Sequence, residues 1–183
     1  TLYVYTPYGY DPSREYNVLY LMHGRRENEG YWFGMKEYAP GGEKYWEMEP
    51  LNTVNILDNM IAAGTCGDLI VVTPTYYNNF NATDDMKRFA YEMKNDIIPM
   101  VEAKYATYAK GDVSPENLIA TRDHRAYAGL SVGSQLGFEA IWSGCLDYIS
   151  WIGTFSGFAS PSESSDIAAV AQKLVDTKNS EFA

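Results

Sequence analysis

The stretch Arg125–Ser134, which reads RAYAGLSVGS, decides the fold. Within it, Gly129–Gly133 matches the G-x-S-x-G pattern of a nucleophile elbow, a tight turn between a strand and a helix. Small residues on both sides of the serine let the strand and the helix approach closely. A glycine-rich loop that contains a serine by chance is the alternative, but an apolar run precedes the motif and a helical pattern follows it. We therefore predict that Ser131 is a nucleophile and that the backbone N–H of Val132 stabilises an oxyanion.

Short apolar runs alternate with helical patterns along the chain. Strands are predicted at 1–6, 17–22, 68–73, 125–130 and 148–155. Helices are predicted at 51–63, 86–108, 135–142 and 167–175, with Pro99 expected to begin a new turn or to kink the second of them. This alternation from residue 17 onward predicts an α/β fold, a mostly parallel sheet with helices on both faces, in a single domain.

The bulk composition excludes several classes of protein. A formal net charge of −10 over 183 residues argues against binding to nucleic acid or to an anionic membrane surface. No apolar run approaches the ~20 residues that a membrane span needs, and the first residues do not resemble a signal peptide. Cys66 and Cys145 fit no zinc spacing, and we expect neither a metal nor a cofactor. Buried free thiols are favoured for both, with a disulfide as the alternative in a secreted protein.

The loop after the 17–22 strand begins with His23-Gly24. In hydrolases with an elbow, this position supplies the second oxyanion donor from the backbone, which assigns that donor to the N–H of Arg25. His23 is predicted to brace the loop rather than to act in catalysis. The second histidine, His124, lies seven residues before Ser131, or roughly 23 Å along a strand at ~3.3 Å per residue. It is therefore expected at the opposite end of the sheet.

Two aromatic loops, 30–46 and 75–85, follow predicted elements at the edge where open α/β sheets bind ligands. Exposed aromatic side chains at such an edge can form a platform for a planar or sugar ligand, or they can pack the loop onto the core. Both readings stay open. On the first, the substrate-binding residues are Trp32 in the first loop and, in the second, Tyr76, Asn78 and Asn79.

Five blocks of sequence together resemble one family. They are LYLMHG at 19–24, ENEGYWF at 27–33, DLIVVTPTY at 68–76, NDIIPMVEAKY at 95–105 and RAYAGLSVGS at 125–134. In order and spacing these blocks are similar to the feruloyl esterases of carbohydrate esterase family 1, within the α/β-hydrolases. The chain departs from the family at Arg25, Arg26 and Ser134, where relatives usually have glycine.

The resemblance implies a secreted serine esterase that releases ferulic or p-coumaric acid from feruloylated arabinoxylan. Its implied partner is a feruloylated xylan or oligosaccharide, and carbohydrate-binding or docking modules are expected elsewhere in the full-length protein. An acetylxylan esterase or another small-acyl esterase on the same fold is the alternative, together with a non-catalytic carbohydrate-binding domain of this fold.

A serine esterase also needs a general base and an acid, which in this fold follow the serine in the order acid, then histidine. No histidine follows Ser131, and Glu163, Asp166 and Asp176 come too early to match the family. Residues 1–183 are therefore expected to form an esterase domain that is incomplete at the C-terminus, where the strands with the acid and the histidine are absent, and also at the N-terminus. Such a chain is expected to be inactive alone.

Overall fold

A computed structural model of the chain describes residues 1–25, 27–35, 51–76, 88–157, 172 and 175. In these ranges five strands form one sheet in the order β1-β3-β2-β4-β5. The strands are β1 (Leu2–Tyr5), β2 (Asn17–Met22), β3 (Leu69–Pro74), β4 (Arg125–Leu130) and β5 (Trp151–Phe155). Strand β1 is antiparallel to β3, and the other neighbours are parallel. The predicted mostly parallel sheet is confirmed.

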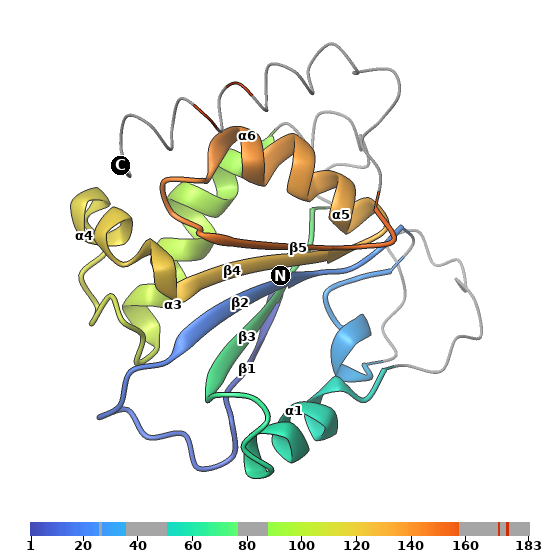
Figure 1. Ribbon diagram of the computed structural model, residues 1–183, viewed down its shortest axis with the longest axis vertical. Coiled ribbons are helices and arrows are strands. Elements are labelled where there is room, and N and C mark those ends of the chain that lie inside the picture. The colour runs from blue at the N-terminus through green and yellow to red at the C-terminus, as the bar shows by residue number, and fades with distance from the viewer. Residues whose placement is uncertain (26, 36–50, 77–87, 158–171, 173–174, 176–183) are drawn as a thin grey trace.

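Helices lie on both faces of this sheet, as predicted (Figure 1). The helical segments are η1 (Tyr31–Phe33), α1 (Thr53–Ala62), η2 (Met93–Ile97), α3 (Ile98–Lys104), α4 (Pro115–Ala120), η3 (Arg122–His124), α5 (Val132–Leu136), η4 (Gly137–Ile141) and α6 (Trp142–Gly144). In Figure 1, α1 lies on one side of the sheet, and α3, α5 and α6 lie on the other. None of the helices in the described part of the chain is long and apolar enough to cross a membrane.

Alternate residues of the central strands face two separate cores. Tyr20 and Met22 of β2 point into the larger core beneath α3 and α5, together with Leu136. Leu21, between them in the sequence, points into a smaller core with Val71 of β3. A strand that is buried on both faces must be apolar along its buried length, which explains the run VLYLM at 18–22 that follows the exposed Asn17.

The structure corrects two predicted element boundaries. The strand predicted from 148 begins only at Trp151, because the N–H groups of Tyr148 and Ile149 both donate to the carbonyl of Cys145, at 2.9 Å, and form a turn. The helix predicted from 135 begins at Val132, because the Gln135 N–H donates to the Ser131 carbonyl at 3.0 Å and closes the first helical turn.

The long helix predicted over 86–108 is helical from 88 to Lys104 within the described residues, and it ends at Tyr105, whose backbone is extended. Its register changes to a π-helical turn at η2, directly before the turn that contains Pro99. Proline has no N–H to donate to the preceding turn, and a π turn accommodates such a break. The helix predicted at 167–175 lies almost entirely outside the described residues.

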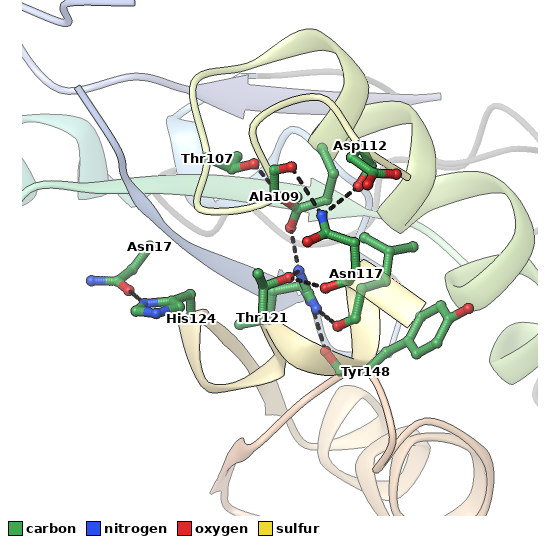
Figure 2. Close-up of polar contacts among 11 residues, drawn as sticks. Asn17, Thr107, Ala109, Asp112, Asn117, Thr121, His124 and Tyr148 are labelled. Atoms are coloured by element: carbon green, nitrogen blue, oxygen red, sulfur yellow. Dashed lines mark hydrogen bonds and ion pairs between the residues drawn. The ribbon is translucent and has the colours of Figure 1, made fainter. Parts of the chain in front are cut away.

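The amino end of β4 is anchored by a buried ion pair. Arg125 Nη1 lies 3.1 Å from Glu102 Oε1, and both side chains are 1% exposed. The same guanidinium donates to the carbonyl of Tyr148 at 2.7 Å and to the hydroxyl of Thr121 at 3.2 Å. Figure 2 shows Thr121 and Tyr148 in this network of polar contacts. Nη2 donates to the carbonyl of Leu118, so each nitrogen of the guanidinium has an acceptor, as a buried charge requires.

Both cysteines are free thiols, so the disulfide alternative is not observed. Cys145 is buried in the larger core, as predicted. Cys66 is only half-buried. It lies just beyond the end of α1, a helix with no fully buried residue, so the surrounding structure does not enclose its side chain.

Candidate active site

Ser131 occupies the turn between β4 and α5, where it forms the N-cap of the helix. Its backbone lies at φ 53° and ψ −110°, a region that residues with a side chain rarely adopt. The turn is held from both sides, because the Ser131 N–H donates to the Phe155 carbonyl at 2.8 Å and the Ser131 carbonyl accepts from Gln135. Backbone strain of this kind is typical of a functional turn, and it is the geometry expected of a nucleophile elbow.

The two glycines of the motif are required by close contacts. A Cβ on Gly129 would lie 2.2 Å from the carbonyl oxygen of Gly133, in the first turn of α5. A Cβ on Gly133 would lie 2.6 Å from the His23 carbonyl oxygen and 2.9 Å from that of Met22. The first glycine thus lets α5 approach β4, and the second lets α5 pack against the end of β2. Tyr127 secures this arrangement by donating its hydroxyl to the Gly133 carbonyl at 2.6 Å.

The two predicted oxyanion donors lie on segments that meet at the same edge of the sheet. Val132 is the first residue of α5, so its N–H has no acceptor within the helix. The loop that carries Arg25 leaves β2 beside β4, because Met22 pairs with Gly129 in the register of these strands. The Arg25 side chain is exposed, and the contribution predicted for this residue is that of its backbone N–H.

His23 has the contacts of a bracing residue. Its ring is fully buried, and burial lowers the pKa of His23 to about 4, so the imidazole is neutral near pH 7. Nδ1 lies 2.8 Å from the Gly24 carbonyl, which can only accept, so this nitrogen carries the proton. Nε2 then accepts from the Thr75 hydroxyl at 2.9 Å. Both ring nitrogens are therefore engaged.

His124 lies at the other end of β4, in η3, immediately before the strand begins. Its Nδ1 lies 2.9 Å from Asn17 Oδ1, a contact that Figure 2 shows. The ring also stacks on Tyr108, with ring centroids 3.4 Å apart. The sequence argument that placed His124 away from Ser131 is confirmed, and neither of the two histidines is positioned as a general base.

The predicted substrate-binding residues lie in different environments. Trp32 is in η1, where it packs against the smaller core, and its indole N–H is buried without a partner among the described residues. Tyr76 is 2% exposed and stacks on His23, with centroids 5.4 Å apart. The deep burial of the Tyr76 ring argues against a role in stacking on a ligand. Tyr76 instead packs against His23 and supports it. Asn78 and Asn79 lie outside the described residues.

Sequence reasoning did not identify Glu27, which the structure places in the loop after β2. Its Oε2 accepts the N–H of Gly24 at 2.6 Å, and Tyr31 interacts electrostatically with the same carboxylate. Burial raises the pKa of the Glu27 carboxyl, although its contacts with Gly24 and Tyr31 oppose that shift. An acidic residue three positions after Gly24 is the only trace of this contact in the sequence.

An elbow serine at the edge of a mostly parallel sheet, with helices on both faces, defines the α/β-hydrolase fold. The described residues hold no group of three or more His, Cys, Asp or Glu side chains that could bind a metal ion. The chemistry that this arrangement supports is covalent catalysis by a serine with backbone oxyanion donors.

Comparisons with known proteins identify the relatives of the chain. No protein-family model matches it. It is 36% identical to the feruloyl esterase module of Clostridium thermocellum, solved as a serine-to-alanine mutant with sinapinate, at a TM-score of 0.72 over 94% of this chain and 56% of that one. It is 40% identical over 157 residues to endo-1,4-beta-xylanase Y of Acetivibrio thermocellus. The matched stretch covers 86% of this chain and 13% of the xylanase.

A ferulic acid esterase of family CE1 from Anaeromyces mucronatus, solved with ferulic acid, shares the fold at a TM-score of 0.61 and 21% identity, over 85% of this chain and 52% of that one. The resemblance to feruloyl esterases that the sequence indicated is confirmed. The chain spans about half the length of these solved structures.

Proposed function

We propose that this chain is the elbow-bearing part of a serine esterase that hydrolyses hydroxycinnamoyl esters on plant cell-wall xylan. The observation that carries the proposal is the strained turn at Ser131, at the amino end of α5 and beside the end of β2. A domain that only binds carbohydrate has no use for a serine held in this conformation. The likeness to feruloyl esterases, at 36% identity over 94% of the chain, supports the ester substrate.

In the proposed reaction, Ser131 Oγ attacks the ester carbonyl carbon while a general base takes its proton. The carbonyl oxygen becomes an oxyanion, which accepts hydrogen bonds from the backbone N–H groups of Val132 and Arg25. Collapse of this intermediate breaks the bond to the sugar oxygen, which takes up the proton and leaves. Water then attacks the acyl-enzyme by the same route and releases the hydroxycinnamic acid.

The general base is proposed to come from a part of the esterase module other than residues 1–183. Both ring nitrogens of His23 are engaged, and His124 lies at the opposite end of β4. Since the feruloyl esterase structures are nearly twice as long as the stretch that this chain matches, they leave room for a histidine and its orienting acid. The isolated chain is accordingly expected to react only weakly with fluorophosphonates, because an unassisted serine hydroxyl is a poor nucleophile.

The xylan context is proposed from the relatives. One is a xylanase of which this chain matches only 13%, so further modules on the same polypeptide are proposed here too. Another carries sinapinate and a third ferulic acid, both hydroxycinnamates. Action on an extracellular polymer implies secretion of the full-length protein. Trp32, Asn78 and Asn79 are proposed to contact the substrate.

The test compares kcat/KM on methyl ferulate and on methyl acetate, with the full-length protein that contains this chain. We expect ferulate to be preferred, because a planar acyl group gains about 0.5–1.5 kcal/mol for each aromatic contact. A preference for acetate would instead indicate a small-acyl esterase. Absence of turnover on either ester, with no fluorophosphonate adduct on Ser131, would overturn the assignment as an esterase.

A further inference from the structure

We propose that Glu27 is a positioning residue for the oxyanion hole: its carboxylate holds Gly24 so that the next amide, that of Arg25, faces the ester oxygen at Ser131. The inference rests on the proposed esterase function, and it assigns to the acidic side chain of this loop a task in the same reaction.

The contact between Glu27 and Gly24 is short and sterically close. Glu27 Oε2 accepts the Gly24 N–H at 2.6 Å, and a Cβ on Gly24 would approach that oxygen to 3.0 Å. On its other side, the same Cβ would lie 3.4 Å from the carbonyl oxygen of Leu130, the residue before Ser131. Gly24 is thus held between the carboxylate and the end of β4. Because glycine has no side chain to restrict its backbone, such contacts decide its conformation.

The carboxylate is itself held in place by the segment that follows it. Tyr31 interacts electrostatically with the Glu27 carboxylate. Asn28 shapes the turn between them, since its Oδ1 accepts from the Gly30 N–H at 2.9 Å and its carbonyl accepts from the Tyr31 N–H at 3.1 Å. The Thr73 hydroxyl donates to the Glu29 carbonyl at 2.7 Å and ties this segment to β3. The brace therefore runs from the sheet to Gly24.

This arrangement divides the amides of the loop between two tasks. The Gly24 N–H is used by Glu27 and cannot also bind an oxyanion. The amide of Arg25 is the next donor along the chain, so the direction in which it points depends on how Gly24 is held. Glu27 acts here as a hydrogen-bond acceptor, a task that the amide oxygen of glutamine also performs.

The experiment uses the full-length esterase with Glu27→Ala, Glu27→Gln and, as a matched control in the same segment, Glu29→Ala. Glu27→Ala is expected to lower kcat on methyl ferulate about 30- to 100-fold with KM nearly unchanged, because a displaced oxyanion donor acts on the transition state. Glu27→Gln is expected to remain within about three-fold of the wild type, since it keeps the acceptor. Glu29→Ala removes a neighbouring carboxylate that holds no amide in the described part of this loop, and it should match the wild type.

A second readout separates positioning from a general structural role. A trifluoromethyl ketone analogue of ferulate forms a tetrahedral adduct with an oxyanion, and its affinity should fall in Glu27→Ala by the same factor as kcat/KM. The affinity for free ferulate should not change. If Glu27→Ala does not fold, Glu27→Asp, whose carboxylate is one methylene too short, is expected to show the same pattern with a smaller loss.

Wild-type activity in Glu27→Ala would overturn the inference. So would equal losses in Glu27→Ala and Glu27→Gln that follow the melting temperature. A wild-type enzyme without turnover or labelling at Ser131 would overturn the proposed function itself, whereas a fully active wild type with indifferent Glu27 variants would overturn only the role of Glu27.

Discussion

The two ends of strand β4 differ in how completely their polar groups are paired. At the amino end, the Arg125 side chain has an ionic partner in Glu102 and further acceptors in Tyr148 and Thr121. At the carboxyl end, Ser131 has a strained backbone and Ser134 has a buried hydroxyl without a partner among the described residues. Saturated polar groups hold a scaffold in one conformation, whereas backbone strain is characteristic of a functional site.

The largest effect should come from the carboxyl end. In the full-length esterase, Ser131→Ala should lower kcat by a factor on the order of 10⁴ to 10⁶, because it removes the hydroxyl that forms the proposed acyl-enzyme. The urea unfolding midpoint should change little. The measurement is initial rates on methyl ferulate, with fluorophosphonate labelling as a check on the same samples. Residual activity above one-hundredth of the wild type would place the nucleophile elsewhere.

Substitutions at the amino end of β4 should change the stability of the protein rather than its catalytic rate. Arg125→Met leaves Glu102 buried without its partner, and it should lower the free energy of unfolding by about 3–5 kcal/mol. The kcat of the folded fraction should stay close to that of the wild type. The double variant Arg125→Met/Glu102→Leu is the control, because it removes both charges and should recover most of the loss. A stable single variant with impaired kcat would contradict the division between the two ends.

His23 gives the carboxyl end a dependence on pH. Its pKa is lowered from 6.5 to about 4 in the folded state by burial. The unfolded chain therefore takes up the proton first as the pH falls, and folding loses stability between these values. From pH 7 to pH 5 the loss should be about 2 kcal/mol. Urea unfolding of the wild type and of His23→Gln at both pH values isolates this contribution. An equal loss in both proteins would show that His23 does not cause it.

The smallest effect should be a gain in stability at Ser134. The Oγ of this residue is buried and has no hydrogen-bond partner among the described residues, so Ser134→Ala removes a desolvated polar group. The free energy of unfolding is expected to rise by about 1 kcal/mol, with kcat unchanged. Ser143→Ala is the matched control, since the Ser143 hydroxyl donates to the Ala140 carbonyl at 3.3 Å and its loss should not stabilise. A destabilised Ser134→Ala protein would show that the hydroxyl has a role in packing.

Local patterns in the chain were enough for the strands and for the position of Ser131. The apolar runs of β2 and β3 are buried on both faces, and this leaves a signal that depends on no distant residue. The opposite placement of His124 followed from counting residues along an extended strand. The turn at Tyr148 is not predicted from the sequence. It forms because the N–H groups of Tyr148 and Ile149 donate to the Cys145 carbonyl, and the apolar run that follows gives no sign of these hydrogen bonds.

The sequence by itself determined the α/β alternation and the elbow, because strand burial and the need for glycines at a tight crossing are short-range constraints. Only the tertiary structure decided which polar groups meet. The Arg125–Glu102 pair joins residues 23 positions apart, and the contact of His23 with Thr75 joins residues 52 apart. It also showed that Tyr76 is buried against His23. Hydrogen bonds and burial depend on the packing of whole elements, and residue type and spacing along the chain do not record that packing.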